Sequence, residues 1–140
     1  MDRITIPPYI LEEIFSHCRA CSPNEACGIL AGKGNEVSKI YLMNNSEQSP
    51  VSYLMDSQEQ FRVMKDMREN RLEMVAIFHS HPSSPPYPSP KDVSLAFYEE
   101  SAYVIVGLAE REPVLRAFSM KEGTVKEIEI VIQGESPDTV

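Results

Sequence analysis

The sequence predicts one α/β domain of the α+β kind with a mixed sheet, because strand-like and helix-like segments alternate along the chain. The chain has 140 residues, about the size of one ordinary domain and too few for two full ones. Hydrophobic residues make up 42% and charged residues 24%, which are ordinary values for a globular protein. No linker or repeat interrupts the pattern. We therefore expect a single domain over residues 1–133, followed by a frayed tail at 134–140.

The first half of the chain is expected to contain two helices and four strands. Apolar runs or polar–apolar alternation indicate the strands, and apolar residues three and four positions apart indicate the helices. A Gly-containing turn at 32–35 joins two of the strands into a hairpin, and Asp56 or Ser57 can cap the second helix. In order, the expected elements are a strand over 3–6, a helix from Pro8 to near Ser22-Pro23, strands over 26–31 and 37–43, a short strand over 53–55, and a helix ending near Asn70 with Phe61, Met64 and Met67 on its core face.

The second half starts with a buried strand over 72–78 that leads directly to His79. Five of the eleven prolines then lie between Pro82 and Pro90, so neither a helix nor a central strand can form there and a stiff loop is expected. The segment that follows has the pattern of a helix start, and we expect this helix to run to about Glu100. Three strands complete the chain, over 103–108, 114–119 and 124–132, with Gly123 in the last turn.

Charge and hydropathy exclude several classes of partner. The chain has 13 basic and 21 acidic residues, a net charge of −8, and so lacks the basic surface that binds nucleic acid. No apolar run approaches the roughly 20 residues that span a bilayer, and the first ten residues do not have the pattern of a signal peptide. Three cysteines, Cys18, Cys21 and Cys27, cannot all pair within one chain. We expect a protein of the reducing cytoplasm that binds neither nucleic acid nor membrane.

The two histidines of His79-Ser80-His81 have the spacing of metal ligands on a strand. Side chains alternate between the two faces of a strand, so both imidazoles point to one face and Ser80 points to the other. A catalytic zinc ion keeps three protein ligands and one open position for water. Asp92 is the candidate third ligand, because the proline loop can return the first turn of the next helix to the histidines.

Hydrolysis at such a site also needs a carboxylate that accepts a proton from water. Glu25 lies immediately before a short apolar strand, where its side chain can face a cleft while its neighbours fill the core. Spacing alone does not distinguish Glu25 from the other glutamates.

Together these residues resemble a known family, the JAMM or MPN-plus (Mov34/PAD-1) zinc metalloproteases. The resemblance rests on HSHP at 79–82, Ser-x-x-Asp at 89–92 and PxExCG at 23–28, and it covers nearly the whole chain, with the short stand-alone bacterial members most similar. It implies that His79, His81 and Asp92 ligate one zinc ion per chain, that Glu25 is the general base on the zinc-bound water, and that Ser89 hydrogen-bonds the oxyanion. It also implies a cytidine-deaminase-like fold with a mostly antiparallel curved sheet flanked by helices.

The resemblance further implies a substrate class. Family members hydrolyse the bond after the C-terminal Gly-Gly of ubiquitin or of ubiquitin-like proteins, including bacterial sulfur carriers. The segment 92–103 is too short for the large insertions of the eukaryotic deubiquitinases, which favours a sulfur-carrier peptidase or a remover of small ubiquitin-like modifiers. With so small a domain, substrate choice must come from its own loops or from a second copy, so a homodimer is part of this expectation.

Three alternatives were weighed against this interpretation. A non-catalytic MPN scaffold that binds a protein partner typically lacks the ligands, whereas all five positions are present here. A zinc deaminase would carry H-x-E and P-C-x-x-C motifs, which are absent. Cys18-x-x-Cys21, with His17 and Cys27 nearby, could form a second zinc or redox site, but one such pair without further ligands is more often incidental, and Cys27 fits a small core residue.

Overall fold

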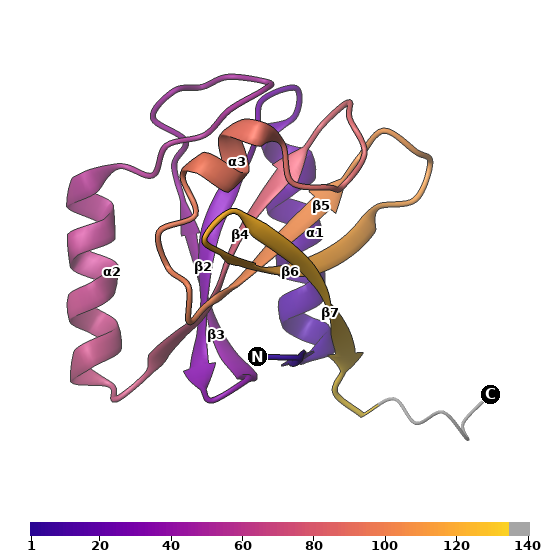
Figure 1. The fold of residues 1–140 in the computed structure, drawn as a ribbon. Helices are drawn as coiled ribbons and strands as arrows, with labels where there is room; N and C mark the ends of the chain where they lie inside the picture. Colours follow the sequence, from indigo (N-terminus) through magenta and orange to yellow (C-terminus); the bar gives the residue numbers. More distant parts are fainter. Residues whose placement is uncertain (135–140) are drawn as a thin grey trace.

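The computed structural model describes residues 1–134, which form three helices and seven strands (Figure 1). Residues 135–140, most of the tail expected to fray, lie outside the described residues. None of the helices within 1–134 has the length and apolar character needed to cross a membrane. The elements are β1 (Arg3–Ile6), α1 (Pro8–Cys21), β2 (Cys27–Lys33), β3 (Glu36–Met43), α2 (Ser57–Glu69), β4 (Glu73–His81), α3 (Pro90–Ser94), β5 (Ala102–Gly107), β6 (Val114–Lys121) and β7 (Thr124–Ile132).

The mixed α/β class is confirmed, but the sheet closes into a barrel instead of forming the mostly antiparallel curved sheet that was expected. The strands follow one another around a closed barrel in the order β1-β3-β2-β4-β5-β6-β7. Three of the seven pairings are parallel: β1 with β3, β1 with β7, and β4 with β5. Closure depends on β1, which pairs along its whole length with β7 and touches β3 at Thr5. β1 has only four residues, and their sequence does not indicate which two strands β1 pairs with.

The two faces of the sheet pack against different helices. One face and α1 form a core that includes Ile14, Leu30, Phe78 and Val104. Strand residues one position away, such as Ile77, belong to separate apolar clusters on the opposite face, together with side chains of α2 and α3. In Figure 1, α1 lies behind the sheet, while α2 and α3 lie on the other side. Because successive side chains of β4 point to opposite faces, the position of each residue in the strand decides whether its side chain faces α1 or faces α2 and α3.

The structure differs from the sequence prediction at three places on this second side. The helix expected to reach Glu100 is α3, and it ends at Ser94. The N–H groups of Ala96 and Phe97 donate to the carbonyls of Val93 and Leu95, which breaks the helical pattern, and the N–H of Tyr98 then donates to the hydroxyl of Tyr103 at 3.0 Å. The strand expected at 53–55 is a single bridge between Asn45 and Met55.

The third difference concerns α2, whose expected core face was partly wrong. Met67 is buried and Met64 packs against the same cluster, but Phe61 is 68% exposed. Helical spacing alone places Phe61 beside both methionines, so it does not distinguish the exposed Phe61 from the two methionines that pack on the sheet. The predicted cap is confirmed, because the carboxylate of Asp56 accepts the N–H groups of Gln58 and Glu59.

Candidate metal centre

Strand pairing brings Ala26, the residue before β2, to the end of β4. The two strands are antiparallel, with Cys27 opposite His79, so the chain just before β2 lies beside the last residues of β4. Ser80 completes this junction, since its hydroxyl accepts the N–H of Ala26 at 2.8 Å and its own N–H donates to the carbonyl of Ala26 at 3.1 Å. As expected, Ser80 points away from the two histidine rings, and it fixes the residue next to Glu25.

Three candidate ligand atoms converge at this point. His79 Nε2 and His81 Nε2 are 3.2 Å apart, and Asp92 Oδ2 lies 3.2 Å from the first and 3.1 Å from the second. Ligands about 2.0–2.1 Å from a tetrahedral zinc ion lie about 3.3 Å from one another. The three atoms therefore fit a zinc ion in both donor type and spacing. Within residues 1–134 this is the one group of His, Cys, Asp and Glu side chains with that convergence.

The proline loop determines which nitrogen of His81 faces this group. The carbonyl of Pro85 lies 2.8 Å from His81 Nδ1, so Nδ1 carries the proton and donates it. In the neutral ring, Nε2 then has the lone pair that a metal needs. Sequence analysis expected a stiff loop here but gave no sign that one of its carbonyls contacts His81.

Asp92 is held by the cap of its own helix. The hydroxyl of Ser89 accepts the N–H of Asp92 at 3.1 Å, and Asp92 Oδ2 accepts the N–H of Ser89 at 2.9 Å, which forms a capping box. Burial alone raises the pKa of Asp92, but the imidazoles of His79 and His81 beside it outweigh burial and hold the pKa well below its usual range. The helix-start interpretation is confirmed, and the same carboxylate oxygen also faces the histidines.

Glu25 is a buried carboxylate beside this cluster. Its side chain is only 4% exposed, and its Oε1 atom has no hydrogen-bond partner. Burial raises the pKa of Glu25 to about 7, although the nearby charge of His81 lowers it in part. A carboxylate of this kind can take up and release a proton near neutral pH, as a general base requires.

A further aromatic group was not found by sequence analysis. The ring of Tyr53 stacks on His79, with ring centroids 4.5 Å apart and planes 25° from parallel. Tyr53 belongs to the segment between β3 and α2, residues 44–56, which we call the β3–α2 segment. From the sequence, Tyr53 was expected in a short strand over 53–55, and nothing in its spacing linked it to the histidines.

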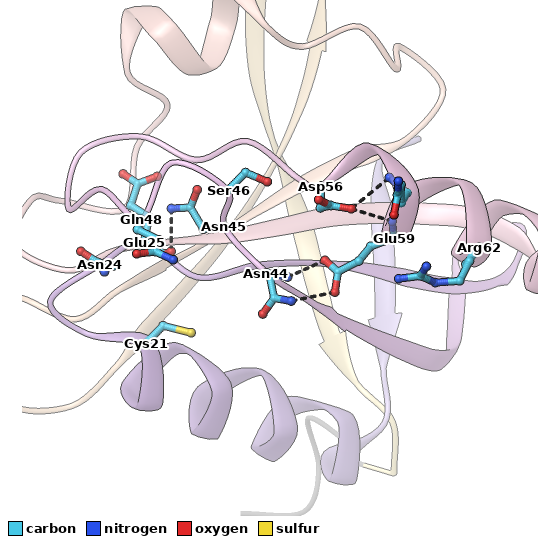
Figure 2. A pocket seen from close by; sticks show the side chains of 11 residues that line it. Cys21, Asn24, Glu25, Asn44, Asn45, Ser46, Gln48, Asp56, Glu59 and Arg62 are labelled. Carbon is cyan, nitrogen blue, oxygen red and sulfur yellow. Dashed lines mark hydrogen bonds between the residues drawn. The ribbon is translucent and has the colours of Figure 1, made fainter.

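A polar cleft of about 870 Å³ opens beside Glu25, between the C-terminus of α1 and the start of α2 (Figure 2). Its lining is mainly carboxylate, amide and hydroxyl side chains, with Cys21 at one edge and Arg62 at the other. Of the candidate site residues, Glu25 lines this cleft, whereas His79, His81 and Asp92 do not.

The second cysteine and histidine cluster does not converge. Cys18 and Cys27 are buried free thiols, and burial raises the pKa of each to about 12. His17 Nε2 lies 3.2 Å from the carbonyl of Cys27 and 3.3 Å from that of Met43, so it bridges β2 and β3. His17 therefore has a structural role, and these side chains do not form the second metal site that was the alternative.

Fold and site together define a JAB/MPN-type domain with a His-x-His and Asp cluster. The family model described as "Prokaryotic homologs of the JAB domain" matches residues 7–121, and the chain belongs to this family. It is a short prokaryotic member of the JAMM/MPN group, as the sequence resemblance indicated.

Several characterised proteins are similar over most of their length. The chain is 37% identical over 123 residues to the CysO-cysteine peptidase of Mycobacterium tuberculosis, covering 84% of this chain and 83% of the relative. It is 34% identical over 128 residues to a probable TtuB-protein conjugate cleaving protease of Thermus thermophilus, covering 91% and 81%. The desampylase of Pyrococcus furiosus is 39% identical over 90 residues, covering 64% of each chain.

Solved structures agree on the fold. The solution structure of a Desulfitobacterium hafniense protein superposes with a TM-score of 0.85 at 42% identity, covering 96% of this chain and 95% of that one. A JAB1/MPN domain protein from Archaeoglobus fulgidus superposes with a TM-score of 0.61 at 18% identity, covering 94% of this chain and 100% of that one, a likeness of fold alone.

Proposed function

We propose that this protein is a zinc-dependent metallopeptidase or isopeptidase. It hydrolyses the bond after the C-terminal Gly-Gly of a ubiquitin-like or sulfur-carrier protein. The observation that carries the proposal is the convergence of His79, His81 and Asp92 with a buried, unpartnered Glu25 beside them. Two imidazoles, one carboxylate and a nearby base are the groups that catalytic zinc hydrolases use.

The proposed chemistry divides between the metal and the protein. His79, His81 and Asp92 would hold the zinc ion, which would supply Lewis acidity and lower the pKa of a bound water molecule toward roughly 7. Glu25 takes a proton from the attacking water and delivers it to the leaving amine, which its raised pKa permits at neutral pH. Ser89 accepts a hydrogen bond from Asp92 N–H and keeps its own hydroxyl proton, so it can donate to the oxyanion.

The substrate class is supported by the names of the relatives. A CysO-cysteine peptidase, a desampylase and a TtuB-conjugate cleaving protease are each described as acting on a small carrier or on its conjugates. An extended Gly-Gly tail can reach a metal centre in a cleft because it has no side chains to obstruct it. Free thiols at all three cysteines support a cytoplasmic location. A homodimer stays a prediction.

The decisive experiment measures zinc and cleavage in three forms of the protein. The wild type should bind about one zinc ion per chain and release an amine from a Gly-Gly-linked conjugate of a ubiquitin-like protein. His81→Ala should lose both zinc and cleavage, because two ligands remain. Glu25→Gln should keep zinc and lose turnover by at least 100-fold, because the amide cannot accept the proton.

Two outcomes contradict the proposal. Zinc content that is unchanged when His79 and His81 are both replaced removes the metal assignment. Zinc binding with no cleavage of any Gly-Gly conjugate offered, and with partner binding instead, supports the alternative of a non-catalytic scaffold.

A further inference from the structure

One side chain organises the β3–α2 segment. The amide of Asn45 donates from Nδ2 to the carbonyls of Glu25 at 3.0 Å and Ser52 at 2.9 Å. Its Oδ1 accepts the N–H groups of Glu47 at 3.0 Å and Leu54 at 3.1 Å. An asparagine side chain has two N–H donors and one oxygen with two lone pairs, so Asn45 uses all of them. Figure 2 shows the contact from Asn45 to Glu25 as a dashed line.

The main chain of Glu25 depends on this segment. Its carbonyl accepts from Asn45, and its N–H donates to the carbonyl of Ser49 at 2.8 Å. Both polar main-chain groups of the general base candidate therefore end in the β3–α2 segment. Oε1 of Glu25 has no hydrogen-bond partner of its own, so these two backbone hydrogen bonds are what hold the residue on this side.

The same amide fixes the backbone around Tyr53. The two residues that flank it, Ser52 and Leu54, are both bonded to Asn45. Between them, the Tyr53 ring stacks on the fully buried His79. His79 Nδ1 has no hydrogen-bond partner, whereas His81 Nδ1 donates to Pro85, so outside the ligand cluster itself the stacked ring of Tyr53 is what restrains the orientation of His79.

We propose that Asn45 is a positioning residue of the active site. Its amide holds the backbone of Glu25 on one side. On the other side it holds the backbone around Tyr53, whose ring packs on the imidazole of His79. The Asn45 side chain contacts neither the three candidate metal ligands nor the Glu25 carboxylate. Its effect on hydrolysis is therefore transmitted through the backbone of Glu25 and the ring of Tyr53. This role rests on the proposed function, and its structural half can be measured without any substrate.

The test is Asn45→Asp, which keeps the shape and the accepting oxygen but replaces both Nδ2 donors. An oxygen then faces the carbonyls of Glu25 and Ser52. We expect kcat to fall by at least about tenfold with KM changed by less than about threefold, and with zinc still near one per chain. In the metal-free protein, we expect hydrogen exchange at the Glu25 N–H to accelerate by at least about tenfold and the nuclear Overhauser contact between the Tyr53 and His79 rings to weaken.

The matched control is Asn70→Asp. Asn70 also donates its amide to a main-chain carbonyl, that of Asp66 at 2.8 Å, but at the far end of α2. Asn70→Asp should keep the wild-type kcat, the wild-type rate of hydrogen exchange at the Glu25 N–H, and the nuclear Overhauser contact between the Tyr53 and His79 rings.

Three results decide the matter. Equal kcat and exchange in the two variants overturn the proposal, and so does a loss of activity in Asn45→Asp that merely follows a loss of folded, zinc-loaded protein. If the wild type cleaves no conjugate, but Asn45→Asp still frees the Glu25 N–H and the Tyr53 ring, the positioning role stands and the proposed function fails.

Discussion

Burial of the Glu25 carboxylate destabilises the folded protein when this group is ionised, and its proposed role as general base explains why it is buried. A carboxylate that is 4% exposed and lacks a partner for Oε1 is harder to ionise in the folded chain than in the unfolded chain. Its pKa rises from 4.5 to about 7. The folded state therefore binds the proton more tightly, and stability is lost as pH rises through this interval.

Replacing this carboxylate should make the metal-free protein more stable at high pH only. Near pH 4 this carboxyl group is mostly protonated in both states, so Glu25→Gln and wild type should differ little in stability. By pH 8 the variant should be the more stable by up to about 3 kcal/mol, the free-energy equivalent of the pKa shift. Chemical denaturation of chelator-treated protein at both pH values measures this difference.

A control separates burial from the loss of charge itself. Glu69→Gln removes an exposed carboxylate at the end of α2, and it should show no such pH-dependent gain. An equal gain in both variants, or none at Glu25, would show that Glu25 is not desolvated in the folded protein.

Among the elements, those with strong local signals were predicted well, and those fixed by tertiary contacts were not. The strands β4 and β7 and both long helices follow from apolar periodicity and from their caps. The end of α3 at Ser94 and the exposure of Phe61 depend on how the folded chain packs around these two helices. Neither is encoded in neighbouring residues.

The candidate site divides in the same way. Spacing alone suggested that His79, His81 and Asp92 could meet, while Glu25 needed the family resemblance. The contacts of Pro85, Asn45 and Tyr53 are made by main-chain carbonyls, by an amide and by a ring on loops. Such groups have no characteristic spacing, so only the folded arrangement shows them.

The proline loop can be tested as an element through Gly107. A Cβ atom at Gly107 would lie 2.8 Å from Pro86 Cδ, too close unless the loop moves. Moving it would weaken the hydrogen bond between Pro85 and His81, so Gly107→Ala should lower zinc affinity by about 10–100-fold. Competition with a chromogenic chelator measures this affinity.

Gly123→Ala is the matched control for backbone strain. Gly123 has φ +79°, but nothing lies within 4 Å of an added Cβ. It should cost about 1–2 kcal/mol of stability without a change in zinc affinity. Equal zinc affinities in the two variants would show that the proline loop does not orient His81.

For the whole molecule, closure of the barrel links both ends of the described chain. β1 contributes Ile4 and Ile6, which are fully buried, and pairs with β7 from Arg3 opposite Glu129 to Ile6 opposite Ile132. Ile4→Ala should therefore cost about 2–5 kcal/mol through the cavity it leaves. The metal centre lies on the opposite side of the sheet from this core, so the two should act on stability independently.

Zinc-linked melting tests that independence. A ligand that binds only the folded state at 100 times its Kd adds about 2.7 kcal/mol, which raises Tm by several degrees in a domain of this size. Wild type and Ile4→Ala should show the same zinc-induced rise in Tm, because distant sites contribute additively, although Ile4→Ala melts at a lower temperature throughout. His81→Ala should show almost no rise. A smaller rise in Ile4→Ala than in wild type would mean that closure of the barrel by β1 also shapes the metal centre, and that the two halves of the molecule are coupled.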